Sequence, residues 1–273
     1  MRGTLPFKMI GIVPAAGSAT RMQPLGGSKE LLPLGQCRQL TGHRGVRLRA
    51  ISEYLVERML LAGAERVCFV ISGEKADLLR FYAQSEYAGR LFFVVQPQPA
   101  GLCDAVFRAV PFVNPAELVL IGLPDTIWYP RHAFAAAPAA SIHLITFPVP
   151  NPEEFDAVIP ASKPSSGQSA AGAVARIEVK SHGSRERRVW GAITAGGREF
   201  LQLAALWRER QCQDQYLGHL FNAWIAAGNR ISFDRVGTHY WDIGSPNGYL
   251  RALKGRVWEE PSAADVSSTP AAA

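Results

Sequence analysis

Short apolar runs that alternate with helical patterns are the feature of this sequence that most constrains its fold. Continuous apolar runs are typical of buried parallel strands, and here they cover 9–15, 66–72, 91–96, 117–125 and 141–149. Apolar residues recur at helical spacing between them, over 50–64, 74–84 and 102–110. This order predicts an α/β fold, a Rossmann-like α/β/α sandwich with a mostly parallel mixed central sheet and helices on both faces.

The second half of the chain has shorter predicted elements. Strands are expected at 156–160, 174–180, 188–195 and 230–236, and helices at 200–210, 215–228 and 247–255. The composition of 162–172 predicts a flexible loop, and that of 259–273 a disordered tail. Since no internal repeat or clear linker interrupts the rest, we expect one domain over 1–258.

Composition excludes several classes of protein. The 273 residues carry a net charge of +6, but no zinc knuckle or aromatic stripe accompanies the basic runs, which argues against nucleic acid. No apolar run reaches about 18 residues, so no membrane span is expected. The four cysteines show no CxxC spacing, and this favours a reducing, cytoplasmic compartment. A homo-oligomer is left open.

A small-residue loop follows the first predicted strand. In parallel sheets ligands bind beyond the carboxyl ends of the strands, so the loops after residues 14, 96 and 123 should converge. Small residues at 15–19 let backbone N–H groups approach a phosphate, and Arg21 and Lys29 add two cations. The loop matches neither GxxxxGK[ST] nor GxGxxG, and a plain turn with two surface cations fits its composition equally well.

Four segments in order resemble the sugar-1-phosphate nucleotidylyltransferases. They are PAAGSATRMQPLGGSKELLPL (14–34), VVQPQPAGLCDAV (94–106), LIGLPDT (120–126) and HYWDIGSPNGYLRA (239–252). With the first strand they cover nearly the whole chain, from residue 9 to about 254. Because the sequence ends soon after the last motif, the left-handed β-helix domain of some relatives is not expected.

The resemblance implies transfer of a nucleotidyl group from a nucleoside triphosphate, dTTP or UTP favoured, to a sugar 1-phosphate, with Mg²⁺ as cofactor. Arg21 and Lys29 would be catalytic, Asp125 and Asp242 would bind Mg²⁺, and Lys180 would bind the sugar phosphate. Nucleotide-binding positions implied by the same motifs are Ala15, Ala16, Gly17, Ser18, Gln96 and Gly101. The amide of Gln96 suits the imide edge of uracil or thymine.

Departures from the family pattern keep two alternatives open. Ala16, Ala19 and Pro124 stand where the family has glycine, and 36–50 is longer than the usual connector. A cytidylyltransferase of the methylerythritol-phosphate type also opens with a similar loop, but it lacks the 239–252 segment. A catalytically weak homologue that binds a nucleotide-sugar and regulates a partner is the second alternative. Retention of Asp125 and Asp242 argues against it.

Overall fold

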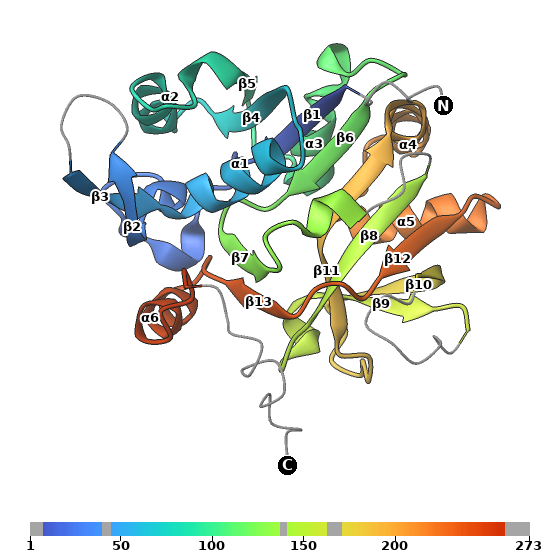
Figure 1. Cartoon of the computed structure of the whole chain (residues 1–273). Helices are drawn as coiled ribbons and strands as arrows, with labels where there is room; N and C mark the ends of the chain where they lie inside the picture. The colour runs from blue at the N-terminus through green and yellow to red at the C-terminus, as the bar shows by residue number, and fades with distance from the viewer. Residues whose placement is uncertain (1–7, 40–44, 137–140, 163–170, 260–273) are drawn as a thin grey trace, which may run out of the picture.

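The computed structural model describes residues 8–39, 45–136, 141–162 and 171–259. Within them, a nine-stranded sheet forms the centre, in the order β5-β4-β1-β6-β11-β8-β12-β10-β9 (Figure 1). Its strands are β1 (Met9–Pro14), β4 (Arg66–Ser72), β5 (Leu91–Gln96), β6 (Leu118–Gly122), β8 (Ile142–Pro148), β9 (Asp156–Pro160), β10 (Gly172–Val179), β11 (Arg188–Gly196) and β12 (Ile231–Asp234). All of these strands except β10 and β11 run in one direction. The predicted mostly parallel mixed sheet is therefore confirmed.

Helices cover both faces of the sheet, as predicted. They are α1 (Ile51–Leu61), α2 (Ala76–Ala83), α3 (Gly101–Phe107), α4 (Gly197–Glu209), α5 (Leu217–Ala226) and α6 (Pro246–Lys254). The core on one face packs α1 and α2 through residues such as Leu55 and Leu78. The core on the other face packs α3, α4 and α5 through residues such as Phe107, Phe200 and Phe221. None of the described helices is long and apolar enough to cross a bilayer.

Two small antiparallel sheets lie outside the main sheet and were not predicted. The segment 36–50, expected as a long connector, instead contributes to a hairpin of β2 (Pro33–Gln39) and β3 (Gly45–Ala50). A second pair joins β7 (Thr126–Tyr129) to β13 (His239–Asp242). Almost all of the predicted flexible loop (162–172) and of the predicted tail (259–273) lies outside the described residues.

The parallel strands place their carboxyl ends at one edge of the sheet. β1 pairs with both β4 and β6, and β5 pairs with β4. The loops that follow these strands therefore emerge together, as the sequence predicts. β6 ends at Gly122, three residues earlier than predicted, because the chain turns at Leu123–Asp125 and enters β7.

Candidate active site

The pair β7–β13 brings together two carboxylates that are 117 positions apart in the sequence. Asp125 immediately precedes β7, and Asp242 ends β13 opposite Thr126. The backbone N–H of Ile243 donates to the carbonyl of Asp125 at 2.9 Å, which continues this pairing past Asp242. The following helix α6 is capped by Ser245, whose Oγ accepts from the N–H of Gly248 at 3.1 Å. Ser245, and not Asp242, therefore caps α6.

Gly244 lies between the two carboxylates. A Cβ atom on this residue would stand 2.5 Å from Asp125 Oδ2 and 3.0 Å from Asp242 Oδ1. The Gly244 N–H donates to Asp242 Oδ1 at 2.8 Å. Oxygens of both carboxylates therefore face one small space that only a glycine leaves open.

Lys29 contacts Asp125 directly. Its Nζ is 2.5 Å from Asp125 Oδ2, and each side chain is 15% exposed. Burial lowers the pKa of Lys29, but the charge and hydrogen bond of Asp125 outweigh burial, so the pKa lies above its ordinary value. Burial and the charge of Asp125 raise the pKa of Asp242, while the charges of Arg21 and Lys29 oppose this. Cations and carboxylates predicted at separate motifs therefore form one cluster.

The small-residue loop after β1 begins buried and ends exposed. Ala15 and Ala16 are buried, whereas Gly17 and Ser18 are exposed to solvent. Ala19 has φ +54° and ψ 34°, the left-handed conformation in which alanine costs roughly 1 kcal/mol more than glycine. It leads into the short 3₁₀ helix Thr20–Met22, from which Arg21 extends.

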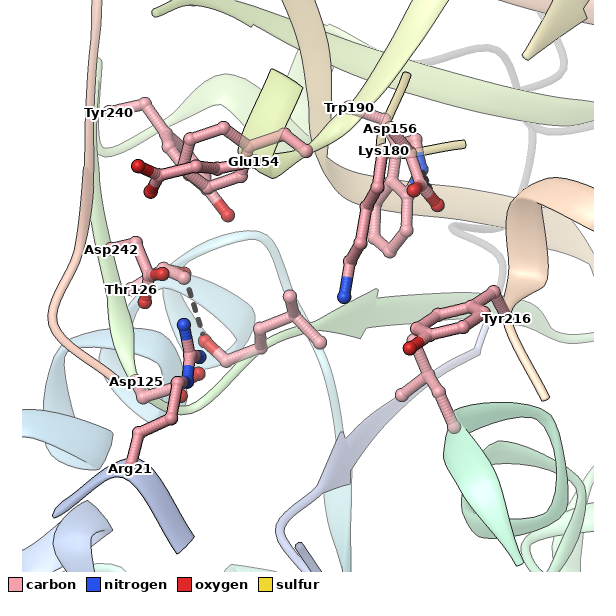
Figure 2. Close-up of a pocket in the computed structure, with 13 residues that line it drawn as sticks. Arg21, Asp125, Thr126, Glu154, Asp156, Lys180, Trp190, Tyr216, Tyr240 and Asp242 are labelled. Atoms are coloured by element: carbon pink, nitrogen blue, oxygen red, sulfur yellow. Dashed lines mark hydrogen bonds between the residues drawn. The ribbon is translucent and has the colours of Figure 1, made fainter. Parts of the chain in front are cut away.

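A cavity of about 200 Å³ connects these groups to Lys180. Figure 2 shows Arg21, Asp125, Thr126 and Asp242 at one side of it and Lys180, Asp156, Trp190 and Tyr216 at the other. The full lining is Arg21, Leu102, Leu123, Asp125, Thr126, Glu154, Phe155, Asp156, Lys180, Trp190, Tyr216, Tyr240 and Asp242. The segments after β1 and β6 thus contribute to one site, whereas the segment after β5 contributes only Leu102 of α3.

Lys180 lies in this cavity, but not on a strand as predicted. It follows the last residue of β10 and adopts a positive φ of 44°. Its N–H donates to the carbonyl of Phe155 at 3.0 Å, and its Nζ is 4.4 Å from the centre of the Tyr216 ring. The strand ends one residue early, and the turn directs this cation into the cavity.

Several cavity residues were missed by the sequence analysis. Asp156 accepts a hydrogen bond from Trp190 Nε1 at 3.3 Å, and its Oδ1 is buried with no hydrogen-bond partner. Burial raises the pKa of this carboxyl group. Tyr216 and Tyr240 add aromatic walls. These four residues come from four separated segments. Asp156, Trp190 and Tyr216 lie outside the motifs, and Tyr240 lies within 239–252 but was not singled out there.

Gln96 and Gly101 have contacts that the sequence analysis did not foresee. The Gln96 amide donates to Gly101 O at 3.2 Å and to Asp104 Oδ2 at 2.7 Å, and the residue is only 4% exposed. These two hydrogen bonds use only the side-chain nitrogen of Gln96, so its side-chain oxygen Oε1 can accept a hydrogen bond from another group. Gly101 has φ +86°, and a Cβ there would stand 2.9 Å from the Cα of Gln215. This packing alone requires glycine, and neither residue lines the described cavity.

The protein has a mostly parallel sheet with helices on both faces and a polar site at the carboxyl edge of that sheet. These features define a Rossmann-like α/β protein. A glucose-1-phosphate thymidylyltransferase of Neisseria gonorrhoeae is 30% identical over 159 residues, which are 55% of this chain and 51% of that protein. This match spans about half the length of that relative. No protein-family model matches the chain.

Solved structures share the fold over nearly the whole chain. The UTP-bound UGPase of Acinetobacter baumannii superposes with a TM-score of 0.72 and 20% identity, covering 94% of this chain and 95% of that one. A UDP-glucose pyrophosphorylase complexed with UDP-glucose gives 0.73 and 16%, covering 93% and 100%. The predicted fold class is confirmed, and so is the resemblance to sugar-1-phosphate nucleotidylyltransferases.

Proposed function

We propose that this protein transfers a nucleotidyl group from a pyrimidine nucleoside triphosphate to a sugar 1-phosphate and releases pyrophosphate. The observation that carries the proposal is the cluster of Arg21, Lys29, Asp125 and Asp242 at one end of a cavity with Lys180 at the other. Such chemistry requires positioning and neutralisation of charge, with little covalent help from the protein.

The residues present fit a magnesium ion that would be held by two carboxylates together with the phosphates of the substrate. Mg²⁺ is bound through one or two carboxylates together with substrate phosphates rather than by a complete protein cage. Asp125 and Asp242 supply two carboxylates that face a shared space beside Gly244. Among the described residues no group of three or more His, Cys, Asp or Glu is arranged to hold a metal. When bound, Mg²⁺ would neutralise charge on the phosphates.

Each cation has a distinct role in the proposal. Arg21 binds the β- and γ-phosphates, and Lys29 stabilises the negative charge that builds on the α-phosphate. Lys29 is held at Asp125 in this structure. Lys180 binds the phosphate of the sugar, and the rings of Tyr216 and Tyr240 provide apolar walls for the sugar.

Pyrophosphate release tests the proposal. Purified protein with Mg²⁺ is assayed with each of the five common triphosphates and several sugar 1-phosphates. We expect pyrophosphate only when both substrates are present, and its loss in Asp242→Asn. Arg66→Met, which removes an ion pair to Glu117 away from the site, serves as control. Turnover in Asp242→Asn that matches the control would contradict the proposed metal site.

Base choice is a further part of the proposal, supported by the thymidylyltransferase relative and the UTP-bound structure. We expect dTTP or UTP to exceed ATP and CTP by at least about tenfold in kcat/KM. If CTP ranks first, the cytidylyltransferase alternative is favoured. Gln96→Ala tests whether the remaining carbonyl oxygen contributes to base recognition. An unchanged ranking of the triphosphates in this variant would remove Gln96 from that role.

A further inference from the structure

The two neighbours of Lys29 in the sequence are both held by residues at the start of α2. The N–H of Ser28 donates to Asp77 Oδ2 at 2.7 Å, and its Oγ donates to Asp77 Oδ1 at 2.7 Å. On the other side of Lys29, Glu30 accepts from Lys75 Nζ through both carboxylate oxygens, at 2.7 and 2.8 Å. The backbone of Lys29 is therefore fixed from both directions.

Lys75 also contacts the start of the small-residue loop. Its Nζ donates to the carbonyl of Ala15 at 2.7 Å, so its three N–H bonds match three acceptors. Lys75 is 7% exposed and Glu30 is 1% exposed. One ammonium group thus joins Ala15, the first residue of the small-residue loop, to Glu30, which directly follows Lys29.

Stability is a weak explanation for this buried pair. Removing two charges from water offsets most of their attraction, and well-packed apolar residues often replace such a pair without loss of stability. Positioning of Lys29 is a better explanation, because Lys29 is the one residue between Ser28, which Asp77 binds, and Glu30, which Lys75 binds. Its side chain extends to Asp125 at the carboxyl edge of the sheet.

We propose that Lys75 and Asp77 are positioning residues that hold the Lys29 ammonium at Asp125 for the transfer step. The effect on the transfer rate rests on the proposed function. The positioning of the Lys29 ammonium at Asp125 does not. Both residues act through Lys29. A displacement of about 1 Å at a group that stabilises a transition state lowers the rate on the order of 100-fold.

The reactivity of Lys29 toward an amine-specific acylating reagent tests the structural part without any substrate. Labelling of the Lys29 peptide is followed by mass spectrometry in wild type, Asp77→Asn and the double variant Glu30→Leu/Lys75→Met. The double variant leaves no unpaired buried charge, so the fold should persist. We expect labelling to be at least threefold faster in both variants, because the ammonium is no longer held at the carboxylate.

Arg66→Met is the matched control for these variants. Arg66 makes a two-pronged ion pair with Glu117 at 2.9 Å and 2.9 Å, as Lys75 does with Glu30, but it lies at the amino ends of β4 and β6. Its loss should leave the labelling of Lys29 unchanged. If Lys29 is labelled at the wild-type rate in both test variants, the inference is overturned.

A double-mutant cycle tests the catalytic part. We expect Asp77→Asn to lower kcat at least tenfold with less than a threefold change in KM for the triphosphate. In a Lys29→Ala background the same change should have no further effect, since Asp77 acts through Lys29. Equal effects in the two backgrounds would overturn the inference. Faster labelling of Lys29 in the variants, together with a wild-type protein that releases no pyrophosphate, would support the positioning and refute the proposed function.

Discussion

Gly244→Ala is a direct test of the paired-carboxylate site. The added Cβ would stand 2.5 Å from Asp125 Oδ2, and an ordinary contact begins at about 3.4 Å, so the carboxylate must move by about 0.9 Å. The backbone of Gly244 is outside the left-handed region and accepts alanine without strain. The substitution therefore acts mainly by separating Asp125 from Asp242.

The magnitude follows from this displacement. A movement of about 1 Å at a group that positions the reacting phosphates costs on the order of 100-fold in rate, or about 2.7 kcal/mol. We expect kcat/KM for pyrophosphate release to fall by that factor and the Mg²⁺ concentration at half-maximal rate to rise. Because the side chains that must move are partly exposed, the thermal midpoint should change by only a few degrees.

Gly89→Ala is the control for this substitution. Gly89 lies in the short 3₁₀ helix Ala88–Arg90, and a Cβ there would meet nothing within 4 Å. Both variants are assayed at saturating and limiting Mg²⁺, with the thermal midpoint measured on the same samples. If Gly244→Ala retains kcat/KM within threefold of Gly89→Ala, the two carboxylates do not act together and the proposed metal site is wrong.

Substitutions at three further positions probe the segment that carries Arg21 and Lys29 and its contact with Asp77. Arg21→Ala should weaken binding of the nucleoside triphosphate far more than that of the monophosphate, measured by calorimetry, because Arg21 is proposed to bind the β- and γ-phosphates; an equal loss for both ligands would exclude that contact. Ala19→Gly should change the free energy of unfolding by less than about 1 kcal/mol, whereas Ala19→Val should lower it by more than about 1 kcal/mol, since a branched side chain fits a φ of +54° poorly; equal urea midpoints for Ala19→Val and wild type would contradict this. Burial raises the pKa of Asp77, but hydrogen bonds from Ser28 and from backbone N–H groups outweigh it, so the pKa lies below its usual range. The stability that Asp77 adds is then fully present above the ordinary pKa of about 3.9 and is lost as the pH falls through the lower folded-state pKa. Thermal midpoints of wild type and Asp77→Asn should differ at pH 7 and converge toward pH 2, and a constant difference would refute the assigned pKa direction.

Local pattern in the sequence determined the strands and helices of the first half. The runs at 66–72 and 91–96 form β4 and β5 with the predicted bounds. β4 is buried almost throughout, as its continuous apolar run indicates, whereas β5 lies at the edge of the sheet and is mostly half-buried. The motifs singled out Arg21, Lys29, Asp125 and Asp242 as candidate site residues, because the resemblance implies charged groups for phosphate chemistry at these positions. The structure places them together.

Only the tertiary structure decided how distant segments meet. Nothing local to Thr126 or Asp242 shows that β7 pairs with β13, yet this register sets the two carboxylates side by side. The same holds for Asp156, Trp190 and Tyr216, which are far apart in the sequence and share one cavity wall. The hydrogen bonds that Lys75 and Gln96 donate, and those that Asp77 accepts, likewise depend on packing between elements. Periodicity and turn chemistry are properties of neighbouring residues, whereas strand pairing and the burial of charges depend on the whole chain.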